Sequence, residues 1–165
     1  MHTTKCGKGA LFMAVTIIGG AGACTGDGSS RCGPTSGLVV NVVDGDTIDL
    51  ASGERIRYLM IDTPELSSDD CYAQEATELN GQLVLDREVR LEYDVECEDR
   101  FGRLLAYVYV GDNEINTVLV ERGYACLLHI PPNGADREAE FSSLENLART
   151  EERGMWGQCE VVTCD

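Results

Sequence analysis

The chain has 165 residues, enough for one domain with short attachments, and a formal net charge of −16. This acidic balance argues against a broad basic surface for polyanions. Of the two histidines, His2 lies in an N-terminal segment that we expect to be cleaved. His129 is then the only one left, which nearly excludes two-histidine hydrolysis and histidine-rich zinc or HNH-type sites.

The first 23 residues have the pattern of an export signal. Two lysines precede an apolar run over residues 10–18, and small residues over 19–23 lead to Cys24. The apolar run is too short to span a membrane. We therefore expect residues 1–23 to be cleaved and the protein to be exported.

Two cleavage patterns fit this segment. Residues 21–23 (Ala-Gly-Ala) form an A-x-A site for ordinary secretion. With Cys24 they also resemble a bacterial lipobox, which lipidates that cysteine, although a lipobox usually has Leu where Ala21 stands. We favour the lipoprotein, because residues 24–36 then form a Gly/Ser-rich tether. A secreted protein is the alternative, and the expected locations are the periplasm, a membrane anchor or the medium.

Five stretches have the pattern of β-strands. β-Branched and alternating apolar residues predict strands over residues 38–43, 47–50, 55–61, 88–93 and 104–110. Asp44-Gly45 forms the hairpin turn between the first two. In the third, alternation places Leu59 on the face of Arg57 and Met60 on the opposite face.

Three stretches have helical spacing of apolar residues, over 72–85, 116–122 and 136–153. Gly123 and Gly154 end the second and third. Five strands with a helix inserted after the third, and more helix at the end, predict an α+β (mainly β) fold, a five-stranded Greek-key barrel of the OB type with three helices. Other short barrels and α+β sandwiches share this pattern. We expect the domain to cover residues 37–157, followed by a Cys-containing tail over 158–165.

Six cysteines lie beyond Cys24, and an even number in an exported chain indicates disulfides. They are Cys32, Cys71, Cys97, Cys126, Cys159 and Cys164. Six cysteines allow 15 pairings, so counting does not give the connectivity. No C-x-x-C spacing is present, which argues against a zinc ribbon or a thioredoxin-type site. Cys126 follows an apolar run and fits a buried thiol as well as a bridge.

The pairing that we favour is Cys71–Cys97, which would tie a loop after residue 65 to the end of a strand. Cys159 and Cys164 either pair with each other or reach back to Cys32.

Three short motifs carry the chemistry, at residues 44–47 (DGDT), 61–65 (IDTPE) and 99–103 (DRFGR). They supply clustered carboxylates, and with Arg57 and Arg103 they supply two guanidinium groups. Carboxylate and carbonyl oxygens suit Ca²⁺ or Mg²⁺, and such a cation polarises a phosphoryl oxygen and activates water. Arginine forks match phosphate geometry. The set indicates metal-assisted hydrolysis of a phosphodiester.

These motifs, together with residues 104–107, 118–120, 123–125, 132–133 and 154–156, closely resemble the staphylococcal nuclease (thermonuclease) family. The resemblance covers about residues 38–156. It implies an OB-fold barrel with three helices and Ca²⁺-dependent cleavage of DNA and RNA that leaves 3′-phosphate products, with Mg²⁺ the less favoured ion. By motif position, Asp46 and Asp62 would bind Ca²⁺ through carboxylates and Thr63 through its carbonyl.

The resemblance also assigns the groups that would act on the phosphate. Glu65 would hold the attacking water as general base, and Arg57 and Arg103 would bind the scissile phosphate. We expect Asp44 and Asp99 to be structural at the site, Asp44 by supporting its turn and Asp99 by pairing with Arg103. Taken singly, each of these residues could be an ordinary loop carboxylate or a surface ion pair.

Arg100 and Phe101 occupy the basic and aromatic positions before Gly102, where substrate binding is expected and Phe101 could stack on a base. Two departures leave the preferred substrate open. The segment over residues 67–70 is short and acidic where the founding member has a longer, lysine-rich loop. Residues 126–131 lack the tyrosines that contact nucleotide in the family.

We interpret the chain as an exported, Ca²⁺-dependent nuclease, acting as a monomer on DNA and RNA. The acidic surface then reflects salt adaptation or solubility, although loss of nucleic-acid affinity is the other interpretation. A catalytically silent OB-fold binding module is the first alternative, and an acidic Ca²⁺-binding surface protein is the second.

Overall fold

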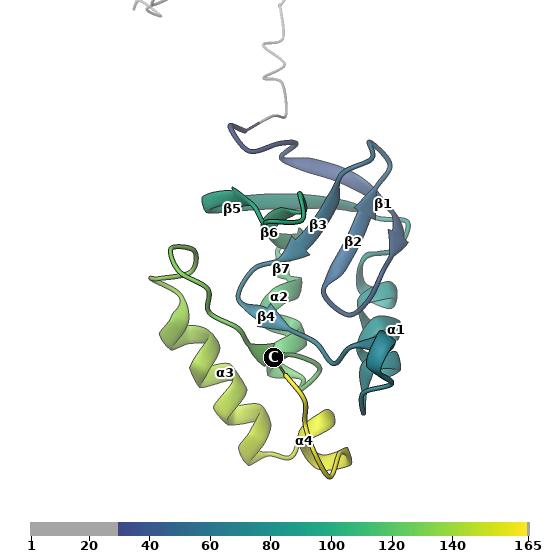
Figure 1. Ribbon diagram of the computed structural model, residues 1–165, viewed down its shortest axis with the longest axis vertical. Coiled ribbons are helices and arrows are strands. Elements are labelled where there is room, and N and C mark those ends of the chain that lie inside the picture. Colours follow the sequence, from purple (N-terminus) through teal and green to yellow (C-terminus); the bar gives the residue numbers. More distant parts are fainter. Residues whose placement is uncertain (1–29, 165) are drawn as a thin grey trace, which may run out of the picture.

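Five strands close into a barrel in the computed structural model, which describes residues 30–164 (Figure 1). The strands are β1 (Ser36–Val42), β2 (Thr47–Leu50), β3 (Arg55–Tyr58), β5 (Glu88–Glu98) and β6 (Leu104–Val110). β1, β2 and β3 are antiparallel neighbours, and β5 pairs with both β1 and β6. A parallel pairing of β3 with β6 closes the barrel. The predicted five-stranded OB-type barrel is confirmed.

The strands form where apolar side chains alternate with polar ones, because alternate residues point into the barrel. The inward residues include Val39, Ile48, Ile56, Val89 and Ala106, each with no exposed surface. Two short strands lie outside this barrel order: β7 (Asn113–Glu114) extends the sheet beyond β6, and β4 (Ile61–Asp62) pairs with β8 (Cys126–Leu127).

The predicted third strand is shorter than expected, because Met60 adopts a positive φ of 67°. This left-handed residue interrupts the alternation and divides the stretch into β3 and β4. Leu59, Met60 and Ile61 are all buried, and the predicted alternation does not continue past Tyr58, where β3 ends. The bend turns the chain after β3 back toward its own arginine.

The three predicted helices are present as α1 (Ala73–Val84), α2 (Ile115–Glu121) and α3 (Glu138–Thr150). A short helix α4 (Met155–Gln158) and a 3₁₀ turn η1 (Leu66–Ser68) are additional. Figure 1 shows α1 and α3 on opposite sides of the lower half of the molecule, with α2 between them. Among residues 30–164 no helix is long and apolar enough to cross a membrane.

Gly123 ends α2 because no other residue fits there. Its φ is 76°, and a Cβ at this position would lie 2.2 Å from the backbone carbonyl oxygen of Arg153. The amide of Met155 donates to the Gly123 carbonyl at 2.9 Å. The close approach joins the end of α2 to the start of α4.

Three disulfides link segments that are distant in sequence, and the predicted Cys71–Cys97 bond is wrong. The bonds are Cys32–Cys97, Cys71–Cys159 and Cys126–Cys164, with Cα–Cα distances of 5.1, 5.9 and 6.2 Å. Cys126 is therefore in a bond and is not a free thiol. Cys159 and Cys164 neither pair with each other nor reach Cys32.

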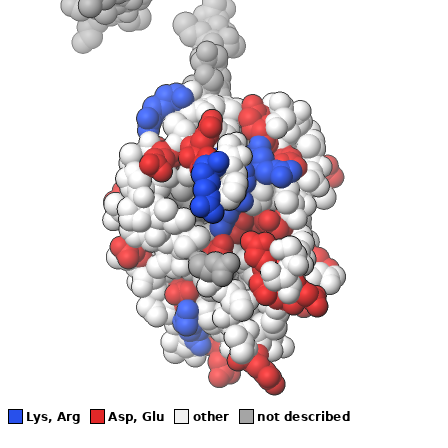
Figure 2. Space-filling model, viewed as in Figure 1, with Lys and Arg blue, Asp and Glu red and all other residues white. Residues whose placement is uncertain are grey.

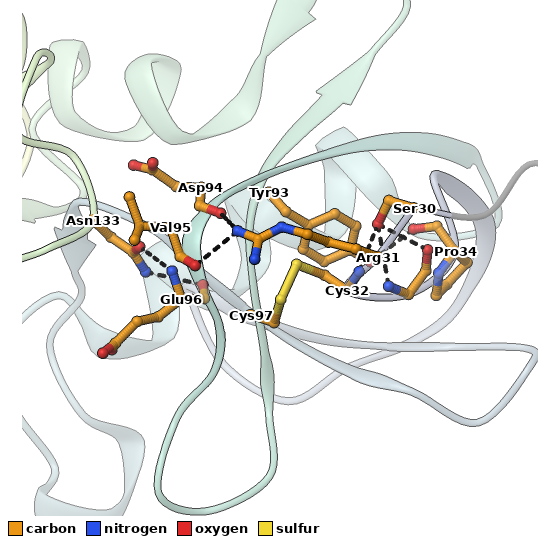
Figure 3. The surroundings of a disulfide bond; sticks show 11 residues. Ser30, Arg31, Cys32, Pro34, Tyr93, Asp94, Val95, Glu96, Cys97 and Asn133 are labelled. Atoms are coloured by element: carbon orange, nitrogen blue, oxygen red, sulfur yellow. Dashed lines mark hydrogen bonds between the residues drawn. A yellow bond between two sulfur atoms is a disulfide. The ribbon is translucent and has the colours of Figure 1, made fainter. Parts of the chain in front are cut away.

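The pairing follows from where the two ends of the domain lie against the rest of it. Cys97 lies near the end of β5, where the N-terminal segment runs beside it (Figure 3). Cys71 lies just before α1, within reach of the residue that follows α4. The tail is thus bonded to the domain at Cys159 and Cys164.

The segment over residues 30–36, the last part of the predicted tether, lies against the barrel. Arg31 donates from Nη2 to the carbonyls of Asp94 and Val95, at 3.0 and 2.8 Å (Figure 3). The Tyr93 hydroxyl donates to the Pro34 carbonyl at 2.7 Å. These residues belong to the domain. The predicted signal over 1–23, the lipidation site at Cys24 and the rest of the tether lie outside the described residues.

Candidate active site

Asp46 lies in the turn between β1 and β2 and is only 4% exposed. Its Oδ2 accepts hydrogen bonds from the amide and hydroxyl of Thr63, at 3.0 and 3.2 Å. Its own amide donates to Asp44 Oδ1 at 3.1 Å, which holds the turn. A Cβ on Gly45 would lie 2.7 Å from Thr63 Oγ1, so glycine permits this close approach. The turn and the segment after β4 are thereby fixed against each other.

Arg57 extends from β3 between two carboxylates. Its Nε lies 3.1 Å from Asp46 Oδ1, and its Nη2 donates to Asp62 Oδ1 at 2.8 Å. Nη1 donates to the carbonyls of Tyr58 and Ile61, at 2.8 and 2.7 Å. The bend at residue 60 brings these acceptors around the guanidinium. One buried cation therefore joins residues from two of the three predicted motifs.

The charges around the Asp46 and Asp62 carboxylates suit a divalent cation. Burial raises the pKa of the Asp46 carboxyl to about 7; Arg57 opposes this shift, and the charges of Asp44 and Asp62 add to it. Crowded carboxylates with a shortage of positive charge are the donor set that Ca²⁺ or Mg²⁺ prefers. Within residues 30–164, no three Asp, Glu, His or Cys side chains gather as a metal cluster. The two carboxylates would need the Thr63 carbonyl, and water, to complete the coordination.

Glu65 begins the short connection to α1, and its backbone is held by local hydrogen bonds. The Glu65 amide donates to Asp70 Oδ2 at 3.2 Å. The Glu65 carbonyl accepts from the amides of Ser68 and Asp70, at 3.3 and 3.2 Å. Its side chain is exposed, so solvent and substrate can reach the carboxylate.

Arg103 is positioned by the loop between β5 and β6. Asp99 Oδ1 accepts from the amides of Phe101 and Arg103, at 2.9 and 3.0 Å, and Oδ2 accepts from Arg103 Nε at 2.6 Å. Burial raises the pKa of Asp99, but the hydrogen bonds from Arg103 and Phe101 outweigh it, so the pKa lies below its usual range. Gly102, with a φ of 78°, completes the turn.

Arg100 and Phe101 form the tip of the same loop. Phe101 is 68% exposed, and the Arg100 guanidinium carbon lies 4.7 Å from its ring centroid. Figure 2 shows blue side chains gathered over the barrel strands in the upper part of this face, with red side chains around and below them. A local cationic region therefore exists on a molecule that is acidic as a whole.

The structure brings the predicted site residues together in two groups. Asp46, Arg57, Asp62 and Thr63 form one group through direct contacts. Arg103, with Asp99, forms the other. The parallel ladder joins the groups, because Leu104 pairs with Ile56, one residue before Arg57.

Two residues near the site were missed from the sequence. Asn80 is fully buried on α1; it accepts from the Tyr58 hydroxyl at 2.9 Å and donates to the Asp44 carbonyl at 3.0 Å. A polar residue four positions after Ala76 on the apolar face of the helix was the available signal. Arg55 lies two residues before Arg57 and shares its outward face, as the strand period requires.

Comparisons with known proteins identify relatives of this chain. Residues 55–158 match the family model described as "Staphylococcal nuclease homologue". A thermonuclease of Staphylococcus intermedius is 35% identical over 142 residues, which cover 78% of this chain and 84% of that protein. The SPbeta prophage-derived endonuclease YokF of Bacillus subtilis (strain 168) is 33% identical over 129 residues, or 73% of this chain and 44% of its own length. Endonuclease YncB of the same strain is 31% identical, with coverage of 73% and 61%. The chain thus spans most of the thermonuclease and only part of the two Bacillus proteins.

Proposed function

Since the chain belongs to the staphylococcal nuclease family, we propose that it is a Ca²⁺-dependent nuclease that hydrolyses phosphodiester bonds of DNA and RNA. The observation that carries the proposal is the buried arrangement of Asp46 and Asp62 around Arg57. It unites carboxylates that can hold a cation with a guanidinium that can bind phosphate, on the strand that closes the barrel.

Asp46 and Asp62 would hold the ion through their carboxylates, and Thr63 through its carbonyl. The bound ion supplies a Lewis acid that polarises the phosphoryl oxygen. Arg57 and Arg103 bind the non-bridging oxygens and stabilise the charge that develops on them in the transition state. Asp99 orients Arg103 for this role, because its Oδ2 accepts a hydrogen bond from Arg103 Nε.

Glu65 accepts a proton from a water molecule while the oxygen of that water bonds to phosphorus. The bond from phosphorus to the 5′ oxygen then breaks, and the 5′ oxygen takes a proton from solvent water. The products are a 3′-phosphate end and a 5′-hydroxyl end. The exposed position of Glu65, at the start of a backbone-fixed turn, suits a carboxylate that meets water and substrate together.

The proposal extends to location. Residues 1–24 have the pattern of a bacterial lipoprotein signal, so the enzyme would act outside the cytoplasm, anchored by lipid at Cys24. Three disulfides in the domain suit an oxidising compartment. Labelling of the expressed protein with a radioactive fatty acid, compared with a Cys24→Ala variant, tests the anchor.

Cleavage of single-stranded DNA and of RNA by the oxidised domain, with Ca²⁺, with Mg²⁺ and with chelator, tests the activity. We expect cleavage that needs Ca²⁺ and that falls by a factor of about 10² or more in Glu65→Gln. Glu88→Gln, at another exposed glutamate, is the matched control and retains activity. End-group analysis should find 3′-phosphates. Absence of cleavage by folded protein under all these conditions would favour a silent binding module.

A further inference from the structure

A cavity of about 580 Å³ lies beside Arg103, outside the group around Arg57. It is formed by the end of β2, the turn into β3 and the loop between β5 and β6. Its lining residues are Asp49, Leu50, Gly53, Arg55, Phe101, Gly102 and Arg103. None of the proposed metal ligands lines it, and Arg103 is the one lining residue that the reaction described above uses.

Arg55 gives the cavity a second cation in line with the phosphate-binding pair. Arg55 and Arg57 share the outward face of β3, because Ile56 between them is fully buried. Their Cα atoms are about 7 Å apart, since a strand rises about 3.4 Å per residue. Leu104 is the partner of Ile56 in the parallel pairing of β3 with β6. Arg55 directly precedes Ile56, and Arg103 directly precedes Leu104. The three arginines therefore follow one path over the barrel.

The Arg55 side chain is held in place and is still accessible. Nε and Nη2 donate to the two carboxylate oxygens of Asp49, at 2.7 and 3.1 Å, and Asn41 donates to the same carboxylate at 2.9 Å. The side chain remains 50% exposed. A guanidinium has five N–H donors, and this pairing engages two of its nitrogens, so donors remain for a phosphate.

Phe101 gives the same cavity an aromatic surface. Its ring is largely exposed, and Arg100 and Arg103 approach it with guanidinium carbons 4.7 and 5.5 Å from the centroid. Apart from its two chain neighbours, nothing lies within 4 Å of where a Cβ on Gly102 would be, so the space over this glycine is open. Aromatic rings flanked by arginines are the usual surface for an unpaired base.

We propose that this cavity binds the nucleotide next to the scissile phosphate, with Arg55 on its phosphate and Phe101 against its base. The inference rests on the proposed nuclease function and adds a length requirement to it. The enzyme then recognises at least two phosphates of a single strand, one at Arg57 and Arg103 and one at Arg55. Asp49 affects the strength of the contact between Arg55 and the second phosphate, because it holds Arg55 in position and also offsets part of its charge.

The test compares two ligands and three variants. Binding of a fluorescent trinucleotide and of a nucleoside 5′-phosphate is measured by anisotropy and competition in the presence of chelator, and KM for the trinucleotide is measured with Ca²⁺. The variants are Arg55→Ala, Asp49→Asn and the control Arg90→Ala. Arg90 on β5 is a matched residue, 48% exposed and paired with Glu92, and it does not line the cavity.

Arg55→Ala should weaken trinucleotide binding about fivefold to tenfold more than nucleotide binding, and raise KM more than it lowers kcat. Asp49→Asn should strengthen trinucleotide binding, and Arg90→Ala should leave the ratio of the two affinities unchanged. Equal effects of Arg55→Ala on both ligands, or none on either, would overturn the inference. If the wild-type protein binds the trinucleotide through Arg55 but never cleaves it, the proposed function fails and the binding site stands.

Discussion

At the scale of single residues, Arg57 is the side chain on which the site depends. It contacts two carboxylates and two carbonyls, and its side chain is only 11% exposed. The desolvation of Asp46 and Asp62 is therefore balanced by one cation. Removing a partner from such a buried group leaves charges without compensation, which is more costly than the net value of the ion pair itself.

We expect Arg57→Met to lower the free energy of unfolding by about 3 kcal/mol in the presence of chelator. The loss should be smaller with Ca²⁺, because a bound cation can compensate the same carboxylates. Activity should fall by a factor of about 10² to 10³, as for loss of a transition-state donor. Urea unfolding with and without Ca²⁺ measures the first effect. An equal loss of stability under both conditions would contradict a shared site for metal and guanidinium.

Asn116 is the residue that joins α2 to the barrel. It is fully buried; its Oδ1 accepts from the Val108 amide at 2.9 Å, and its Nδ2 donates to the Leu59 carbonyl at 2.8 Å. Asn116→Ala leaves both backbone groups unpaired and should reduce the unfolding free energy by about 3 kcal/mol. Asn113→Ala, at an exposed position, should change it by less than about 0.5 kcal/mol. Thermal denaturation of both variants makes the comparison, and equal midpoints would refute the assigned role.

At the scale of elements, each disulfide supports one segment of the site. Cys97 lies two residues before Asp99 and so fixes the base of the loop with Arg103. Cys71 follows the turn that begins at Glu65. Cys126 is the strand partner of Asp62 in the pairing of β4 with β8. The disulfides to the two ends of the domain thus hold in place the segments that carry the site residues.

Loss of two of these bonds should therefore have different kinetic effects. Cys71→Ser with Cys159→Ser should lower kcat, since the Glu65 turn loses its support. Cys32→Ser with Cys97→Ser should raise KM as well as lower kcat, since the loop from Arg100 to Arg103 loosens. Each pair should also reduce stability by about 2–5 kcal/mol. Steady-state kinetics at a temperature where circular dichroism shows both variants folded provides the measurement, and each variant is the control for the other. Identical changes in kcat and KM would argue for a purely global effect.

The elements differ in how far the sequence could predict them. Strand positions were predictable because inward and outward alternation is local, and β2 and β6 have the expected bounds. The break at Met60 was not, since a methionine gives no signal for a positive φ. Disulfide pairing depends on where the two ends of the domain lie in the fold, which no local pattern contains. The site motifs could be located, but the central position of Arg57 and the cavity at Arg55 required the closed barrel.

At the scale of the whole molecule, an acidic protein binds an acidic polymer. The formal charge is −16, and on the face shown in Figure 2 several cationic side chains gather over the barrel strands. Long nucleic acid approaching the cationic region also meets the surrounding carboxylates. Local attraction and global repulsion therefore oppose each other, and salt screens the longer-range repulsion first.

We predict that kcat/KM for long single-stranded DNA rises as salt increases from about 10 mM to about 150 mM, where the Debye length shortens from about 30 to about 8 Å. Most proteins that bind nucleic acid lose affinity over this range. A trinucleotide carries few charges and should show a smaller rise, so it serves as the control substrate. A steady fall in kcat/KM for the long substrate would show that attraction to the arginines outweighs repulsion by the carboxylates at all distances.

The parallel pairing of β3 with β6 also determines when, during synthesis of the chain, the site can assemble. The ribosome makes Asp46, Arg57, Asp62 and Glu65 well before Leu104–Val110, and β3 has no closing partner until that strand emerges. Arg103 enters the same surface only when β6 docks. An unfinished chain, or one held unfolded for passage through a membrane, therefore lacks the assembled arginine pair. We expect the polypeptide to be inert toward the nucleic acid of the cell that makes it until the barrel closes.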